Sequence, residues 1–411
     1  MDPYLRGRLS EGARRRLSLT NPGGGPHGPP PLALYVHVPW CVSKCPYCDF
    51  NSHALRDDIP EASYVDTLLY DLDQELRRLP PPVPLVSVFI GGGTPSLLSG
   101  VAITCLLAGI RSRAPLTADA EVTLEANPGT ADAHKFAAYR AAGVNRLSMG
   151  VQSLSPDQLK RLGRIHGPDE ARDAFRLARE SGFENINLDL MYGLPDQGLQ
   201  QAREDLERAL ELEPEHLSYY QLTLEPNTVF FAAPPTLPDD DLTADMQLQG
   251  AELLAKADFD QYEVSAYARP RRHCRHNINY WTFGDYLGIG AGAHGKRTDT
   301  ANWHVERSAK LGHPSAYLEP RNRDHLVNSK CVLVEQDLIL EFAMNAFRLT
   351  NGFAHDLFER HTGLGFDRIA ERIAKAEFDG LLTQSGTRIN STERGRLFLN
   401  NLIALFASDH E

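Results

Sequence analysis

The stretch LALYVHVPWCVSKCPYC, residues 32–48, joins a β-rich run to three closely spaced cysteines. Residues 32–38 are apolar and aromatic, which predicts a buried strand with the cysteines in the loop that follows it. Five more strand-like runs follow along the chain: residues 85–91, 121–126, 144–150, 186–193 and 216–224. Segments with helical spacing of apolar residues separate them: residues 64–76, 99–113, 133–143, 169–182 and 200–212.

This alternation predicts an α/β fold. Strands joined by helices form a parallel sheet with right-handed crossovers. Six units at this spacing favour a partial (β/α)6 barrel over a flat sheet, although periodicity alone does not decide between the two. In a barrel of this kind the working groups lie at the C-terminal ends of the strands, and the cysteine loop falls at such an end.

Three further regions flank the barrel, which we assign to residues 32–270. Residues 1–31 include NPGGGPHGPPP, in which nine of eleven residues are Pro or Gly, and are expected to be a disordered leader. The arginines before it leave a transit peptide as the alternative. Residues 271–330, in an irregular stretch that begins near residue 225, connect the barrel to a C-terminal helical domain at 331–411. A hairpin turning at Ser385–Gly386 suggests a small wing in that domain.

The composition limits the function. The 411 residues carry 42 basic and 54 acidic side chains, a formal net charge of −12, so a general nucleic-acid binder is not expected. No run approaches ~18 uncharged apolar residues, which predicts no integral membrane segment. Six cysteines are too few for a disulfide scaffold, and we expect a cytoplasmic protein.

The cysteine loop has the spacing C-x3-C-x2-C at Cys41, Cys45 and Cys48. A structural zinc site prefers four ligands, so zinc would need His37 or His53 as well. A disulfide would leave one thiol over. Three thiolates suit a 4Fe–4S cluster in which one iron stays open to a ligand with nitrogen and oxygen donors.

Other polar residues and glycines are also expected near the C-terminal ends of the strands. Residues 91–95, GGGTP, follow the second strand, and consecutive glycines let backbone amides approach a ligand closely. Glu125 ends the third strand, Gln152 follows the fourth, and Asp189 lies in the apolar fifth, where an unpaired charge is costly. For any one of them a structural hydrogen bond is the alternative to cofactor contact.

The cysteine spacing resembles that of the radical S-adenosylmethionine superfamily. Within it, five motifs resemble the oxygen-independent coproporphyrinogen III oxidases and their relatives: YVHVPWCVSKCPYCDFNSH (35–53), GGGTPS (91–96), EANPG (125–129), RLSMGVQS (146–153) and LDLMYGLP (188–195). The resemblance runs from about residue 32 to the C-terminus. It implies a radical SAM barrel with a C-terminal, mainly helical domain.

The resemblance also implies cofactors and the residues that hold them. Cys41, Cys45 and Cys48 would bind a 4Fe–4S cluster, whose open iron binds S-adenosyl-L-methionine. Matching the family motifs one position at a time gives the remaining contacts to that cofactor: Tyr35, Tyr47, Gly92, Gly93, Thr94, Glu125, Gln152, Arg164 and Asp189. Whether a second S-adenosyl-L-methionine binds, and whether the first is cleaved, stays open, and no catalytic residue is assigned.

Two features resemble the heme-chaperone branch of that family. Phe50 stands where the true oxidases carry a fourth cysteine, and HNINYW (276–281) matches the motif implicated in heme binding in the chaperones. His276 would then ligate heme iron, with His273 and Cys274 as alternative or second ligands. The alternative for His276 is a structural histidine packed in the core. His294 is expected to line the cofactor pocket, and two further cysteines, Cys105 and Cys331, are expected to be small core residues.

The resemblance therefore implies a heme chaperone that passes heme to acceptor proteins, with respiratory membrane enzymes as the suggested acceptors. A homodimer is compatible with it. The alternative is an oxygen-independent coproporphyrinogen III oxidase, so whether the chain is an enzyme stays open.

Overall fold

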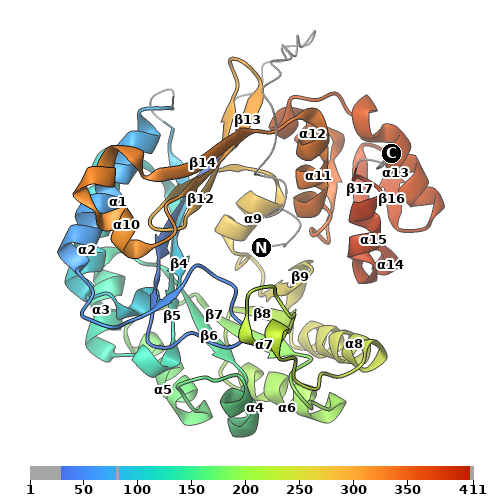
Figure 1. Ribbon diagram of the computed structural model, residues 1–411. Coiled ribbons are helices and arrows are strands. Elements are labelled where there is room, and N and C mark those ends of the chain that lie inside the picture. Colours follow the sequence, from blue (N-terminus) through green and yellow to red (C-terminus); the bar gives the residue numbers. More distant parts are fainter. Residues whose placement is uncertain (1–28, 80–82, 408–411) are drawn as a thin grey trace.

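The computed structural model describes residues 29–79 and 83–407, and most of the expected leader lies outside them. The first strand of the described residues is β1 (Leu32–Val38), where the sequence predicts it. Twelve strands form one curved sheet in the order β14-β13-β12-β11-β1-β4-β5-β6-β7-β8-β10-β9 (Figure 1). The sheet does not close, because β14 and β9 remain its edges, so the molecule is the partial barrel that the sequence indicates.

The six predicted strands form the parallel centre of this sheet: β1, β4 (Leu85–Gly92), β5 (Leu116–Ala126), β6 (Arg146–Gln152), β7 (Ile186–Tyr192) and β8 (His216–Gln221). The connecting helices lie along its outer face (Figure 1): α1 (Glu61–Leu76), α2 (Gly100–Arg113), α3 (Ala133–Ala142), α4 (Pro156–Arg161), α5 (Pro168–Glu180) and α6 (Leu199–Leu210). Short 3-10 helices follow β4, β5 and the later helix α10, at Pro95–Leu97, Pro128–Thr130 and Pro320–His325.

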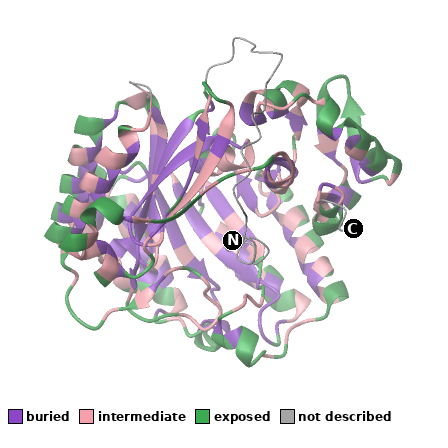
Figure 2. Cartoon of the chain, turned by 45° about the horizontal axis from the view of Figure 1, so that its top comes forward, coloured by how far each residue is buried: buried purple, intermediate pink, exposed green. Residues whose placement is uncertain are grey.

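The main core lies between the outer face of this sheet and these helices. Leu34, Val36, Val88 and Ile90 are fully buried, as parallel strands covered on both faces require. Figure 2 shows the buried strands at the centre of the molecule and the exposed faces of the helices around them. No helix within residues 29–79 and 83–407 has both the length and the apolar character needed to cross a membrane.

The expectation of an irregular stretch from about residue 225 to 330 is wrong. It holds α7 (Val229–Ala232), α8 (Asp240–Lys256), β9 (Asp260–Glu263), β10 (Ala266–Ala268), α9 (Arg275–Trp281), β11 (Asp285–Ile289), β12 (His294–Asp299), β13 (His304–Lys310), α10 (Pro314–Leu318) and β14 (Val327–Val332). β11 pairs in parallel with β1, and β12 to β14 continue the sheet antiparallel. These strands are polar on at least one face, so they lack the apolar runs that mark the central strands.

Helix α9 carries the HNINYW motif and packs on the concave face of the sheet, against β4 and β1 (Figure 1). Its other side contacts α11 (Glu335–Ala346), the first helix of the C-terminal region. The C-terminal region continues with α12 (His355–Thr362), α13 (Asp367–Phe378), α14 (Glu393–Leu397) and α15 (Leu399–Ala404). Helix α9 therefore lies between the barrel and that region.

A three-stranded sheet accompanies these helices, in the order β15-β17-β16: β15 (Phe353–Ala354), β17 (Arg388–Ser391) and β16 (Leu382–Ser385). The predicted hairpin is present, with Gly386 at φ 59° in its turn. Phe342, Phe358 and Ile389 belong to a second apolar core, which Phe283 and Val305 join from the barrel side. The C-terminal region is thus mainly helical, as the sequence indicates, and shares its core with the segment that follows α9.

A buried cluster of charged side chains connects the antiparallel strand β13 to α1. Lys310, 1% exposed, contacts Asp71 and lies 2.6 Å from Glu75 (Nζ to Oε1), and Tyr317 donates to Asp71 at 2.7 Å. Replacing Lys310 with methionine would leave the buried Asp71 without its cation, and Glu75 would keep only its ion pair with Arg78 at 3.2 Å. We expect the free energy of unfolding to fall by about 3–5 kcal/mol, measured by chemical denaturation.

Lys375→Met is the matched control for this prediction. Lys375 forms an exposed pair with Asp379 on α13, and such pairs contribute less than about 1 kcal/mol. Equal losses of unfolding free energy in the two variants would show that the buried cluster contributes no more to stability than an exposed ion pair.

Candidate functional site

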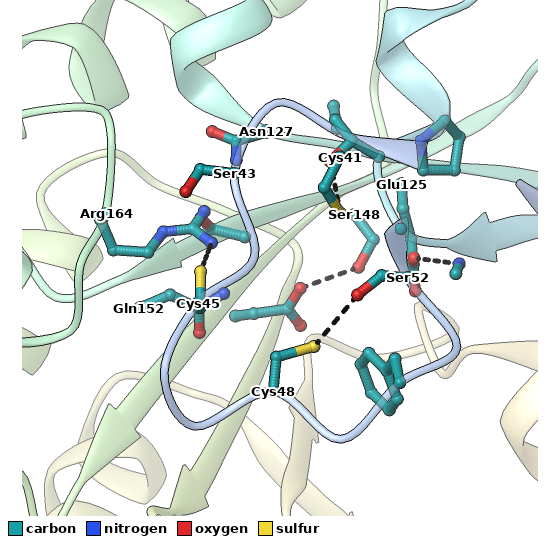
Figure 3. Close-up of a pocket in the computed structure, with 18 of the residues that line it drawn as sticks. Cys41, Ser43, Cys45, Cys48, Ser52, Glu125, Asn127, Ser148, Gln152 and Arg164 are labelled. Carbon is teal, nitrogen blue, oxygen red and sulfur yellow. Dashed lines mark hydrogen bonds between the residues drawn. The ribbon is translucent and has the colours of Figure 1, made fainter. Parts of the chain in front are cut away.

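A pocket opens at the C-terminal ends of the parallel strands (Figure 3). It is lined by eleven residues singled out from the sequence: Cys41, Cys45, Tyr47, Cys48, Gly92, Gly93, Thr94, Glu125, Gln152, Arg164 and Asp189. Most come from the cysteine loop and from the ends of β4, β5 and β6, while Asp189 lies in the middle of β7 and Arg164 in the segment after α4. The barrel thus gathers residues that are up to about 150 positions apart in the sequence into one site.

The cysteine loop is held at both ends. Trp40 and Cys41 form β2, which pairs with β3 (His53–Ala54) and closes the loop. Thr94 Oγ1 donates to Cys41 Sγ at 3.4 Å, and Cys48 Sγ lies 3.9 Å from Ser52 Oγ. Burial raises the pKa of the Cys41 and Cys48 thiols, so both are neutral at pH 7 without a metal.

The histidines that a zinc site would need are placed elsewhere. His37 Nε2 lies 2.8 Å from the Asn51 carbonyl oxygen and Nδ1 lies 2.9 Å from the Tyr35 hydroxyl, so both of its nitrogens are engaged. His53 packs edge-on against His313, with ring centroids 4.9 Å apart. Neither histidine lines the pocket, and a three-cysteine site remains.

The glycine loop after β4 packs so closely against His37 and Trp40 that it has no room for side chains. Gly92 has φ 115°, and a Cβ there would lie 2.6 Å from the His37 ring. A Cβ on Gly93 would lie 2.5 Å from the Trp40 carbonyl oxygen. The Gly92 amide donates to Glu125 Oε2 at 2.9 Å. The Gly93 amide donates to the Val38 carbonyl oxygen and the Thr94 amide to the Trp40 carbonyl oxygen, both at 2.7 Å. The backbone therefore forms this wall, and these hydrogen bonds fix its position.

Two carboxyl groups and one guanidinium give the pocket its charge. Burial, and then the proximity of Asp189, raise the pKa of Glu125 to about 8, and burial also raises the pKa of Asp189. Arg164 Nη1 donates to Cys45 Sγ at 3.5 Å and Nη2 to the Gly150 carbonyl oxygen at 2.6 Å (Figure 3). Its Nε is buried and lacks a hydrogen-bond partner within the described ranges.

The raised pKa of Glu125 predicts a pH dependence of stability. The cofactor-free native protein keeps a proton that an unfolded Glu releases near pH 4.3, so stability falls as pH rises toward about 8. We expect the melting temperature of the cofactor-free protein to drop between about pH 5.5 and about pH 8.5, and to drop less in Glu125→Gln. Glu252→Gln, at an exposed site on α8, should keep the wild-type dependence; identical curves for all three proteins would contradict the assignment.

The sequence did not single out several pocket residues. Ser148 and Gly150 lie on the inward face of β6, and Tyr220 of β8 donates to Gln152 Oε1 at 2.7 Å. Gln152 itself has φ 69°, which turns the chain at the end of β6. The alternation of side chains along β6 places residues 146, 148 and 150 on one face, and this period could have identified Ser148.

Two expected pocket residues lie outside it. Tyr35 does not line the pocket; its ring lies deeper in the barrel, 6.3 Å from both the Phe89 and the His276 rings, and burial raises its pKa. His294 starts β12 as an exposed residue and does not line the pocket either. The position of a residue along a strand predicts on which face its side chain lies, but it does not predict how deep in the barrel that side chain lies.

His276 is also away from the pocket. It is 1% exposed, its Nδ1 lies 2.9 Å from Ser87 Oγ, and its Nε2 is buried without a hydrogen-bond partner in the described chain. Its ring stacks on Phe89 at 5.0 Å and meets Tyr280 edge-on at 4.6 Å. Burial lowers the pKa of His276 to about 3, so the imidazole is neutral.

The neighbours of His276 are bound to other groups. His273 stacks on Tyr262 with ring centroids 4.4 Å apart, and the fully buried Cys274 donates to Glu121 Oε1 at 3.4 Å.

The prediction that the remaining cysteines are core residues is wrong for Cys105, which is exposed on α2 because it lies on the helix face opposite the buried Ile103 and Leu106. Cys331 is partly buried on the edge strand β14.

The donor set fits an iron–sulfur cluster with a charged nucleotide ligand. Three soft sulfur donors share one wall, and the partly buried Arg164 cation lies beside them, where it can balance the negative charge of a thiolate cluster. The sulfurs make hydrogen bonds to protein groups here, and no three metal-binding side chains of the described residues are already grouped at metal-binding distance. Thiol deprotonation and small side-chain rotations would accompany cluster binding.

The chain is similar to known proteins along most of its length. Residues 35–209 match the Radical SAM superfamily, and residues 333–398 match the HemN C-terminal domain. The chain is 51% identical to heme chaperone HemW of Escherichia coli (strain K12), over 92% of this chain and 99% of that protein, and 48% identical to its Haemophilus influenzae counterpart over the same shares.

A more distant relative is the mitochondrial radical S-adenosyl methionine domain-containing protein 1 of Bos taurus, 38% identical over 82% of this chain and 78% of that protein. Among solved structures, coproporphyrinogen III oxidase HemN from Escherichia coli superposes with a TM-score of 0.77, covering 92% of this chain and 91% of the other. At 24% identity, that likeness establishes the shared fold.

Proposed function

The chain belongs to the heme chaperone HemW family of the radical SAM superfamily, and on that premise we propose that it binds heme and transfers it to acceptor proteins. The observation that carries this proposal is the imidazole of His276. Its Nε2 is buried without a partner, on the helix that bears the HNINYW motif, among aromatic rings. A neutral imidazole nitrogen is a ligand for heme iron.

The surroundings of His276 support a flat apolar ligand. Tyr35, Phe89 and Tyr280 face it from β1, β4 and α9, and each remains only partly buried. Aromatic faces of this kind pack well against a porphyrin ring. When Nδ1 donates its proton to Ser87 Oγ, Nε2 keeps the lone pair that iron requires.

We assign the pocket to the cofactors that superfamily membership implies, a 4Fe–4S cluster and S-adenosyl-L-methionine. Cys41, Cys45 and Cys48 would hold the cluster, and an open iron would offer a binding position to the exchangeable nucleotide. The Gly92–Gly93 backbone and Thr94 would meet the methionine end. Glu125, Gln152 and Asp189 would offer oxygen and amide groups to the remainder, and Arg164 would balance charge.

The partners follow from the family. We propose transfer from the cytoplasm to heme-acceptor proteins, among them respiratory membrane enzymes, with a homodimer as one form of the carrier. Phe50, 55% exposed at the pocket rim, replaces the fourth cysteine of the oxidases, which supports a carrier over an oxidase.

The test uses one anaerobic preparation with its cluster reconstituted. Hemin binding is measured by absorbance titration, and heme transfer by the appearance of holo-acceptor in heme-depleted respiratory membranes. The same preparation receives coproporphyrinogen III, S-adenosyl-L-methionine and a reductant. Stoichiometric hemin binding, transfer to the membranes and no porphyrin turnover are expected. Protoporphyrinogen formation would assign the oxidase activity instead, and absence of hemin binding would overturn the carrier.

A further inference from the structure

Arg146 is the largest fully buried side chain of the described molecule, at 1% exposure. It lies at the start of β6 with its side chain on the inward face of the sheet. Within residues 29–79 and 83–407 its guanidinium takes part in no ion pair, and its Nε lacks a hydrogen-bond partner. A buried cation without a direct partner is costly, so this position requires an explanation.

Thr123 of β5 stands beside Arg146 in the parallel register. Its Oγ1 is likewise buried and unpartnered in the described chain. Two residues further along the same strands, Glu125 and Ser148 line the cofactor pocket. Because strand side chains alternate between faces, Thr123 and Arg146 form the next layer inward from that pocket, about 6.6 Å deeper.

The third unpartnered atom of this layer is Nε2 of His276. Phe89 of β4 stands beside Thr123 in the same row of the sheet, and its ring stacks on that of His276 at 5.0 Å, so the imidazole lies against the row that Thr123 and Arg146 share. A guanidinium, a hydroxyl and an imidazole from three different elements thus face the barrel interior with hydrogen-bonding capacity unused.

The nearby carboxylates are engaged elsewhere. Glu121 Oε1 accepts from the Arg275 amide at 3.0 Å and from Cys274 Sγ, which caps α9. Asp189 accepts from Asn187 Nδ2 at 2.8 Å and from Ser148 Oγ at 3.4 Å. Neither carboxylate forms an ion pair with Arg146 within the described residues, so the Arg146 Nε–H stays available to an incoming anion.

We propose that Arg146 and Thr123 form a carboxylate recess that receives a propionate group of heme, next to the iron ligand His276. The inference rests on the proposed heme-binding function and deepens it. Guanidinium groups bind carboxylates in a planar, two-point geometry, and Thr123 adds a hydroxyl donor. Heme carries an iron and two carboxylates, which suits a recess that pairs an imidazole with a cation.

The experiment compares hemin with hemin dimethyl ester, in which both propionates are masked. Dissociation constants are measured by absorbance titration for the wild-type protein, Arg146→Gln and Thr123→Val. A charge-assisted hydrogen bond predicts that wild type prefers hemin by roughly 10- to 100-fold. Arg146→Gln should reduce that preference to about onefold to threefold while binding of the ester changes little, and Thr123→Val should reduce it less.

The controls separate this role from a structural one. Arg146→Lys retains the charge and should keep part of the preference. Arg307→Gln removes a partly buried arginine that is paired with Glu341, and should leave the preference intact even where it lowers the melting temperature. Reconstituted cluster absorbance reports that each variant is folded.

The possible failures are distinguishable. If hemin does not bind at all, the proposed function falls. If hemin binds and the preference for it survives in Arg146→Gln, the recess is not a propionate site and Arg146 is compensated by Glu121 and Asp189 alone.

Discussion

Replacing Cys45 with alanine is expected to abolish the iron–sulfur absorbance of the anaerobically reconstituted protein and to lower bound iron and sulfide to background. A cluster that offers an open iron needs all three thiolates, and no other thiol lines this pocket within the described residues. The loss should also release Arg164 from its hydrogen bond to Cys45 Sγ. Iron and sulfide content, together with the visible spectrum, measure the effect.

Cys105→Ala is the matched control for the cluster prediction. Cys105 is exposed on α2 and does not line the pocket, so this variant should bind iron and sulfide like the wild-type protein. A colourless wild-type protein that holds zinc would contradict the cluster assignment. So would a Cys45→Ala variant that retains the full spectrum.

The central strands could be predicted from the sequence because of where they lie. Strands β1 and β4 to β8 are covered by helices outside and by α9 or cofactor-site side chains inside, and such strands read as apolar runs. The capped helices were equally clear: α3 ends at Gly143, which takes φ 101°. The boundaries agree to within three residues, except that β5 begins at Leu116, five residues before the predicted start.

The remaining part of the sheet could not be predicted in the same way. β12 and β13 carry Lys296, Arg307 and Lys310, whose charges are balanced by acids distant in sequence. A charged strand buried by long-range ion pairs has no local signature, because the partners that neutralise it cannot be identified from the segment itself. The stretch around residues 285–332 therefore looked irregular although it forms four strands.

The cofactor site was predicted better than the interior of the barrel. The cysteine and glycine segments lie in loops whose place at the strand ends follows from topology alone. The depths of Tyr35 and His276 depend on α9 packing into the concave face of the sheet, a tertiary contact that no local pattern reports.

Replacing His276 with alanine is expected to weaken hemin binding by at least about tenfold and to change the absorption spectrum of the bound heme, because the axial nitrogen is lost. The ring is neutral and its Nε2 has no partner in the described chain, so no internal hydrogen bond at that nitrogen opposes iron ligation. Titration with hemin under anaerobic conditions measures both effects.

The burial of His276 adds a kinetic expectation to the same variant series. At 1% exposure the imidazole is reached only after local movement of α9, so wild-type hemin association should be slow compared with diffusion. Ser87→Ala removes the hydrogen bond at Nδ1 and should speed association. His273→Ala, in the half-buried residue stacked on Tyr262, is the control and should keep wild-type affinity and spectrum. If His273→Ala loses heme and His276→Ala does not, the heme ligand is the half-buried His273 rather than the enclosed His276.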